Sequence, residues 1–251
     1  MPLVSIIMPS FNSMLYIEKA VCSVIRQSFC DWELIIIDDC STDGTYDFLL
    51  KRFSSDPRIV IDRLQENSGG PTLPRNCAMQ RASGEYIAFL DSDDEWHPNK
   101  LERQIYYMNK FGAFISCTAY GVINEQGERV GSFTPPVEND YAGLLKANTI
   151  GCLTCIYNRK KIGELRFLEC GHEDYALWLS ILKRGYKVIG VQEELASYRL
   201  VRGSVSSNKL KVFSFFWNIY KNVEGFSLFV SLILCFRYMV LNFNKYKADG
   251  S

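Results

Sequence analysis

The sequence has no surplus of charge of either sign. Its 251 residues include 28 Lys or Arg and 28 Asp or Glu, so the formal net charge at pH 7 is zero. A nucleic-acid-binding domain usually presents a basic surface, and no basic run with interleaved aromatic residues occurs in this chain. We therefore expect no nucleic-acid partner.

Long hydrophobic segments are also missing. The first eight residues lack a basic stretch and a long apolar run, and Pro9 interrupts them, so they do not resemble a secretory signal peptide. The uncharged run 225–236 has twelve residues. A membrane-spanning helix needs about 20. The sequence predicts a protein that stays in the cytoplasm.

The cysteines are too few and too scattered for a secreted disulfide scaffold. There are nine, an odd number, which fits a reducing compartment. Cys152 and Cys155, with Cys170 and His172 further along, suggest zinc ligands by type. However, residues 151–157 are predicted as a strand, on which residues three apart point to opposite faces. This geometry disfavours zinc.

Short, continuously apolar runs predict an α/β fold with a mostly parallel, Rossmann-like central sheet flanked by helices. Residues 34–37 and 86–90 are typical of strands buried on both faces of such a sheet, and residues 3–8 supply another strand. No Gly-x-Gly-x-x-Gly follows that first strand, so a dinucleotide-binding fold is disfavoured.

Acidic residues follow two of these strands directly. Asp38 and Asp39 come after one, and Asp91, Asp93 and Asp94 come after the other. Since parallel α/β sheets bind ligands beyond the carboxyl ends of their strands, we expect these acids to share one site. Clustered carboxylates suit Mg²⁺ or Mn²⁺, completed by phosphate oxygens of a substrate. For an isolated Asp-x-Asp, a solvated turn that caps the next helix is the alternative interpretation.

Five ordered motifs within residues 1–205 resemble family 2 glycosyltransferases of the GT-A fold, of the bacterial surface-polysaccharide type. They are Val-Ser-Ile-Ile-Met-Pro-Ser-Phe-Asn at 4–12, Ile-Ile-Ile-Asp-Asp-Cys-Ser-Thr-Asp-Gly-Thr at 35–45, Asn67-Ser-Gly-Gly with Pro74-Arg75-Asn76, Phe89-Leu-Asp-Ser-Asp-Asp, and Gly171-His-Glu-Asp174. The resemblance implies an inverting sugar transfer from a nucleotide diphosphate donor, most often UDP, with Mn²⁺ or Mg²⁺. Pro74 departs from the family pattern, which usually has a small residue there, and this puts the loop before Arg75 in doubt.

The resemblance also implies roles for single residues. Asp39 is expected to contact uracil, and Asp174 to be the catalytic base. The acids after the second strand are expected to hold ribose, metal and diphosphate: Asp91 and Asp93 as substrate ligands, Asp93 and Asp94 as metal ligands. The remaining substrate-binding candidates are Pro9, Asn12, Arg75, Trp96, Glu173, Arg199 and Arg202.

Two of these assignments have a plainer alternative. Acids in the first turn of a helix are favoured by the helix dipole alone, so without the family match Asp174 is a structural acid. With the match, a carboxylate there takes the proton of the acceptor hydroxyl. Arg199 and Arg202 suit diphosphate oxygens, but an ordinary exposed loop has the same composition.

The organisation expected is a glycosyltransferase domain at 1–208 followed by an amphipathic helical tail at 209–251. Within the domain, residues 1–97 should bind the nucleotide sugar and 98–208 the acceptor. In the tail, apolar side chains share one arc of a helix: Leu228, Phe229, Leu232, Ile233, Phe236, Met239, Val240 and Phe243. The tail covers the core, dimerises, or lies at the cytoplasmic face of the inner membrane as a peripheral contact.

The function expected is transfer of one sugar from a UDP-sugar to a hydroxyl of a lipid-linked glycan, in O-antigen or capsular polysaccharide synthesis. A non-catalytic sugar-nucleotide-binding scaffold or sensor is the alternative from another class, although such a module has no need of a base at Asp174. A sugar-phosphate nucleotidyltransferase would carry a Gly-rich, basic loop after the first strand, which this chain lacks.

Overall fold

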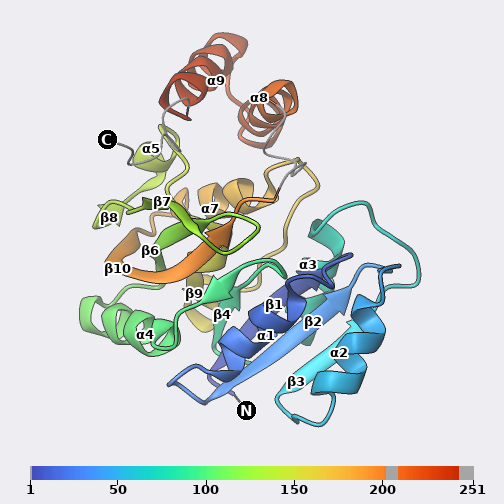
Figure 1. Ribbon diagram of the computed structural model, residues 1–251. Helices are drawn as coiled ribbons and strands as arrows, with labels where there is room; N and C mark the ends of the chain where they lie inside the picture. Colours follow the sequence, from blue (N-terminus) through green and yellow to red (C-terminus); the bar gives the residue numbers. More distant parts are fainter. Residues whose placement is uncertain (1, 202–208, 243–251) are drawn as a thin grey trace.

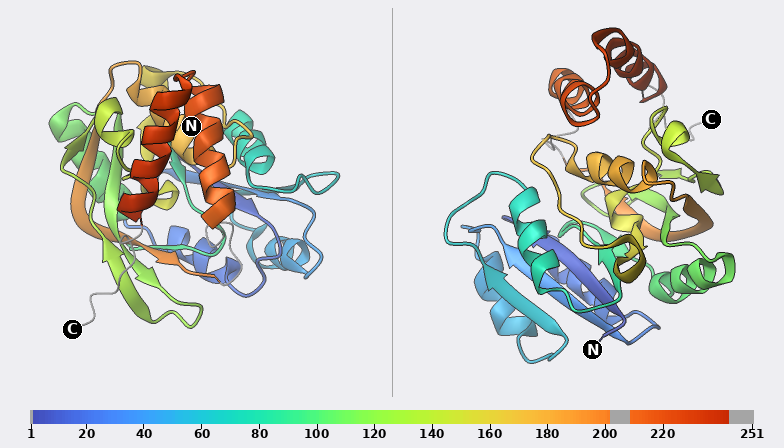
Figure 2. Two further views of the ribbon diagram at one scale, coloured as in Figure 1. Left: turned by 90° about the horizontal axis from the view of Figure 1, so that it is seen from above. Right: turned by 180° about the vertical axis from the view of Figure 1, so that it is seen from behind.

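The computed structural model describes residues 2–201 and 209–242 (Figure 1). One sheet with the strand order β3-β2-β1-β4-β9-β6-β10-β5 forms the centre, while β7 pairs with β6 and β8 with β10. Helices cover the sheet on both sides (Figures 1 and 2). The α/β architecture predicted from the apolar runs is confirmed.

The N-terminal part of the sheet is parallel throughout. Its strands are β1 (Val4–Ser10), β2 (Trp32–Asp38), β3 (Ile59–Arg63) and β4 (Tyr86–Phe89). The helices that connect them are α1 (Ile17–Ile25), α2 (Thr45–Phe53) and α3 (Thr72–Arg81). Because the strands are parallel, the chain leaves β1, β2 and β4 at the same edge of the sheet.

The second part of the sheet contains both parallel and antiparallel pairs. The mostly parallel arrangement expected from the sequence therefore describes the first part of the sheet. Its strands are β5 (Glu95–Trp96), β6 (Ile115–Ile123), β7 (Arg129–Phe133), β8 (Glu138–Asn139), β9 (Ile156–Asn158) and β10 (Val188–Arg199). β6 and β10 are parallel to each other, and β9 runs antiparallel between β4 and β6. The helices are α4 (Lys100–Phe111), α5 (Tyr141–Leu144), α6 (Arg159–Ile162), α7 (Glu173–Leu182) and the 3₁₀ helix η1 (Cys152–Thr154).

Two local expectations were wrong. The segment predicted as a strand at 151–157 begins with η1, and only its end belongs to β9. Pro74 does not disturb a loop, because it is the third residue of α3. The first four N–H groups of a helix have no partner within the helix, so a proline there costs no hydrogen bond. Arg75 N–H already bonds to Pro71 O at 3.0 Å.

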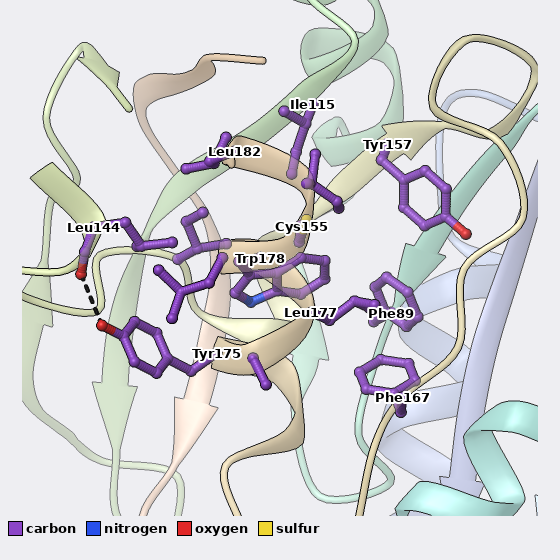
Figure 3. Close-up of a cluster of buried hydrophobic side chains, with 14 of the residues drawn as sticks. Phe89, Ile115, Leu144, Cys155, Tyr157, Phe167, Tyr175, Leu177, Trp178 and Leu182 are labelled. Carbon is purple, nitrogen blue, oxygen red and sulfur yellow. Dashed lines mark hydrogen bonds between the residues drawn. The ribbon is translucent and has the colours of Figure 1, made fainter. Parts of the chain in front are cut away.

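Helix α7 is anchored in one of the two apolar clusters of the core (Figure 3). Its Trp178 is fully buried, and the indole lies edge-on to Phe89 of β4 at 5.6 Å between ring centroids. Phe167 contacts the same Phe89 ring at 5.4 Å. This packing fixes α7 relative to the strand whose end carries the acid cluster.

The C-terminal tail packs against the domain. It consists of α8 (Lys209–Asn218), a π-helical turn η3 (Ile219–Val223) and α9 (Leu228–Asn242). Figure 2 shows α8 and α9 side by side beyond α5 and α7. Buried side chains of the tail belong to the same apolar cluster as α7: Phe216, Ile219, Tyr220, Cys235 and Tyr238. The boundary expected at 208 falls within 202–208, outside the described residues.

In the part of the chain that the structure describes, every helix is too short or too polar to cross a bilayer.

Candidate active site

The loop after β4 brings the acid cluster to the carboxyl edge of the sheet. Asp91 is partly exposed, with 29% of its side chain accessible. Ser92 in the same loop shares a 2.6 Å hydrogen bond with Ser13, which follows β1. The loops after the first and fourth strands are therefore joined directly.

Arg75 connects this cluster to the start of α7. Its Nη2 donates to Asp91 Oδ1 and its Nη1 donates to Glu173 Oε1, both at 2.6 Å, and only 6% of its side chain is exposed. The two carboxylates more than offset burial, so the pKa of Arg75 is raised well above its ordinary value. The guanidinium is thus engaged by protein acids. The expected role of Arg75 in substrate binding stays a prediction.

Asp93 and Asp94 occupy different environments. Asp94 is almost fully buried, and its Oδ1 accepts the Arg199 backbone N–H at 2.8 Å. Asp93 is partly exposed and has no ion-pair partner among the described residues. Burial, and then the neighbouring Asp91 charge, raise the pKa of Asp93 to about 6. Burial and the charges of Asp93 and Asp91 raise the pKa of Asp94 well above its ordinary value.

Arg199 lies behind the acid cluster rather than over the site. Its side chain is fully buried and donates to Glu95 Oε1 at 2.5 Å, to Asp93 O at 2.9 Å and to Asn124 O at 3.0 Å. The Arg199 guanidinium is buried among these protein acceptors and exposes no surface in this structure, and its role as a diphosphate ligand stays a prediction. Arg202 lies outside the described residues.

The loop after β2 carries the expected base-binding acid. Asp39 is buried, and its carboxylate accepts the Ser68 N–H at 2.8 Å and the Ser68 hydroxyl at 3.0 Å. Asn12, exposed in the loop after β1, accepts the Thr42 N–H at 2.8 Å. The loops after β1, β2 and β3 therefore hold one another in place beside Asp39.

Two expected substrate ligands are core residues. Pro9 is buried in β1. It lies two residues beyond Ile7, the last β1 residue that pairs with β4, so its missing N–H leaves that ladder intact. Trp96 is 3% exposed, and its indole N–H donates to Leu153 O at 2.7 Å. Both side chains are buried in the protein itself, and their roles as substrate ligands stay predictions.

Asp174 lies in the first turn of α7, next to Glu173, and is partly exposed. Among the described residues its carboxylate makes no hydrogen bond and no ion pair. The partly buried Cys152 lies near it. Burial raises the pKa of this thiol well above its ordinary value, the Arg75 charge opposes the rise, and Asp91 and Asp174 add to it. Asp91 and Asp174 thus face a common neighbourhood around Arg75 and Cys152.

The comparison with known families decides the identity of the chain. The model of "Glycosyl transferase family 2" matches residues 5–165. The chain belongs to this family.

Two relatives and one solved structure extend this result. The chain is 43% identical to the putative teichuronic acid biosynthesis glycosyltransferase TuaG of Bacillus subtilis (strain 168), covering 94% of this chain and 93% of that one. It is 39% identical to the UDP-Glc:alpha-D-GlcNAc-diphosphoundecaprenol beta-1,3-glucosyltransferase WfgD of Escherichia coli, covering 98% and 96%. The structure of S. aureus TarS 1-349 in complex with UDP-GlcNAc superposes with a TM-score of 0.72 at 21% identity, covering 97% and 73%. The expected GT-A fold is confirmed.

The residues that the sequence missed in this glycosyltransferase are those that join the loops. Nothing in the local pattern around Cys152 marks it as a neighbour of Asp174, because η1 was expected to be a strand. The Ser13–Ser92 bond joins residues 79 positions apart. The motif that contains Arg75 marked this residue as a site candidate, but it did not show that Asp91 and Glu173 are its partners.

Proposed function

We propose that this family 2 glycosyltransferase transfers a sugar with inversion from a UDP-sugar to a hydroxyl of a lipid-linked glycan. The setting that we propose is the synthesis of a bacterial surface polysaccharide such as O-antigen or capsule. The observation that carries the proposal is the bridge formed by Arg75. Its guanidinium donates hydrogen bonds to Asp91, which follows β4, and to Glu173, which precedes Asp174 in the first turn of α7. Donor-binding acids and a free carboxylate are thereby brought to one site.

The donor side of the proposal rests on Asp39 and the relatives. Asp39 is oriented by Ser68 at the edge where β2 ends, and a carboxylate there suits an N–H of the uracil ring. WfgD is named for UDP-Glc, and TarS is solved with UDP-GlcNAc. Both names support a UDP-sugar.

The acid loop fits Mn²⁺ or Mg²⁺. No group of three or more His, Cys, Asp or Glu within the described residues could enclose a metal ion. Mg²⁺-type sites often use one or two carboxylates plus phosphate oxygens and water. Asp93 meets this requirement, because its carboxylate is partly exposed, lies near Asp91 and makes no ion pair among the described residues. We propose Asp93 and the Asp91 oxygen that Arg75 does not bind as ligands, in place of Asp94.

A bound divalent cation would neutralise charge on the departing diphosphate. The chain's own contribution to the reaction is then made by Asp174. As the acceptor oxygen forms its bond to the anomeric carbon, the bond from that carbon to the diphosphate breaks on the opposite face. The hydroxyl proton moves to the Asp174 carboxylate, which has no competing partner among the described residues.

The acceptor side of the proposal rests on the outer face of α9, formed by Leu228, Phe229, Leu232, Ile233, Phe236 and Val240. Phe229 is 71% exposed and Phe236 is 72% exposed. Apolar clusters on a monomer mark interaction surfaces, and Arg237 on the same helix suits anionic headgroups. We propose that this face lies in the membrane interface. WfgD, named for an undecaprenol-linked acceptor, supports this.

Turnover of variants tests the assignment of Asp174. The wild type is incubated with UDP-sugars and a GlcNAc-diphospho-lipid, and products are detected by mass spectrometry. Asp174→Asn should lower kcat by ~10²- to 10⁴-fold, the usual effect of a positioned base, with Mn²⁺-dependent UDP binding retained. The matched control is Glu173→Gln, which should lose less. An Asp174→Asn enzyme within about threefold of wild type would contradict the assignment.

Sedimentation with vesicles tests the membrane contact. Phe229→Glu with Phe236→Glu should release the protein from vesicles that contain anionic lipid. The control is Phe111→Glu on α4, where the side chain is similarly exposed at 61% but lies on another surface. If the wild type does not sediment with vesicles, this part of the proposal is wrong.

A further inference from the structure

The tail contacts the backbone that leads into α7. Asn218 Nδ2 donates to Cys170 O at 3.4 Å. The His172 ring, at the N-cap position of α7, lies 4.9 Å from the Phe216 ring and 5.7 Å from the Phe215 ring. Aromatic side chains of α8 therefore pack on the turn that carries Asp174.

Gly171 shows how close this packing is. Its φ angle of +101° is one that L side chains rarely adopt, and a Cβ at this position would lie 2.1 Å from the Phe215 ring. The tail thus rests directly on main chain that is three residues from Asp174.

The residue after Asp174 is held by the tail as well. Tyr175 is fully buried, and its hydroxyl donates to Leu144 O at 3.1 Å (Figure 3) and lies 2.9 Å from the Tyr220 hydroxyl. Its ring packs against Phe216 at 5.2 Å. The tail therefore contacts residues on both sides of Glu173 and Asp174.

The other end of α7 has its own connection to the tail. Lys183, the C-cap residue, pairs with Glu224 at 2.9 Å, and Glu224 also accepts the Tyr141 hydroxyl at 2.5 Å. Only 4% of the Glu224 side chain is exposed. The tail fixes α7 at both of its ends.

We propose that the tail supports catalysis by holding the turn that carries Asp174. Its positioning residues are Phe216, Asn218 and Tyr220. The inference rests on the proposed role of Asp174 as the base. Since that carboxylate has no hydrogen bond of its own in the described chain, its position depends on the backbone of the turn. Proton transfer requires hydrogen-bond reach, and a displacement of about 1 Å in a catalytic group costs ~10²-fold in rate.

The experiment compares conservative variants of the full chain. Tyr220→Phe removes the hydroxyl contact with Tyr175, and Phe216→Leu replaces the ring that packs on His172. The control, Ile219→Val, removes one methyl group from the same buried segment and leaves these contacts in place. The assay uses UDP-glucose and a GlcNAc-diphospho-lipid with a short, water-soluble alkyl chain, so that membrane binding plays no part.

The two test variants should lose about tenfold or more in kcat, with the donor KM within about twofold of wild type, because the reacting turn is displaced while donor contacts remain. Ile219→Val should retain its kcat within about twofold. Unchanged kcat in folded Phe216→Leu and Tyr220→Phe would overturn the proposal. An equal loss in Ile219→Val would also overturn it, since the effect would then follow stability alone.

Hydrogen exchange of the amides at 172–176 gives a readout independent of sugar chemistry. Exchange there should be about tenfold faster or more in Phe216→Leu than in wild type, because local opening of the turn becomes easier. Unchanged exchange would overturn the proposal. If the wild type transfers no sugar from any donor, the proposed function fails, and faster exchange still identifies the tail as the support of this turn.

Discussion

Replacing Asp93 by Asn should make the free protein more stable and the ligand-bound protein less so. Asp93 carries a charge that no ion-pair partner in the described residues balances, and burial and Asp91 raise its pKa from 3.8 to about 6. Asparagine has nearly the same shape without the charge. The variant therefore removes an electrostatic cost of folding and, by our proposal, a metal ligand.

The size of the stability change follows from the pKa. A rise from 3.8 to about 6 corresponds to an upper bound of ~3 kcal/mol, at 1.36 kcal/mol for each unit. Because Asp93 is partly exposed, solvent reduces this cost, and we expect ~1–3 kcal/mol. For a domain of this size that is a rise of about 2–12 °C in Tm.

The sign of the effect depends on pH. An acid whose pKa is higher in the folded state than in the unfolded state penalises folding fully above the folded value. For Asp93 the penalty is complete above about pH 6 and vanishes below pH 3.8. The stability gain of Asp93→Asn should therefore be largest at pH 7.5 and mostly lost at pH 4.5.

Melting curves of wild type and Asp93→Asn at the two pH values, with and without Mn²⁺ and UDP, provide the assay. Ligands that bind the folded state raise its Tm, so Mn²⁺ with UDP should stabilise the wild type and have little effect on the variant. A variant that is no more stable than wild type at pH 7.5, or equally more stable at both pH values, would refute the electrostatic argument. Full stabilisation by Mn²⁺ and UDP would refute the metal role.

Three further substitutions separate structural residues from ligand-binding ones. Asp94→Asn should keep Mn²⁺-dependent UDP binding within about threefold in calorimetry, because burial already favours the neutral form; a coupled loss of both ligands would restore Asp94 as a metal ligand. Trp96→Phe should lose ~1–3 kcal/mol in denaturant unfolding as Leu153 O loses its donor, with UDP affinity unchanged. Arg75→Met should lose ~3–5 kcal/mol, since two acids are left unpaired; a loss below about 1 kcal/mol would contradict the bridge.

The first part of the fold could be predicted because its strands are buried on both faces. Such strands appear as continuous apolar runs, and β1, β2 and β4 lie where those runs are. η1 could not be predicted, because its residues Cys152–Thr154 are compatible with a strand by composition. Its 3₁₀ conformation depends on contacts with β4, β6 and β10, which are distant in sequence.

The acid cluster could be predicted for the same reason, whereas the partners of its members could not. A charged residue at a strand end shows where a site lies, but the ion pair that it makes depends on tertiary structure. Arg75 and Glu173 are 98 positions apart, and Arg199 and Glu95 are 104 positions apart. Both arginines were predicted to bind substrate because their type suits it, whereas their acceptors in this structure are protein groups.

In the tail, the helical wheel predicted the apolar arc of α9 but not the direction in which that arc faces. The apolar arc expected for α9 exists, but Phe229 and Phe236 on it are exposed, while the buried side includes Ser231 and Cys235. An amphipathic helix usually turns its apolar arc to its own core. α9 does the reverse, so a further surface must cover that arc if it is to be buried.

The distribution of partners among the acids supports the proposed mechanism. Asp91 and Glu173 each form an ion pair with Arg75, and Asp94 accepts the backbone N–H of Arg199. Within the described residues, Asp93 and Asp174 are the acids of this site that have neither an ion pair nor a side-chain hydrogen bond. Unbalanced charge in a partly buried site costs free energy, and folding alone gives no reason to keep it. A cation at Asp93 would remove that cost, and Asp174 would take the proton of the acceptor hydroxyl, which is the division of labour that the proposed transfer requires.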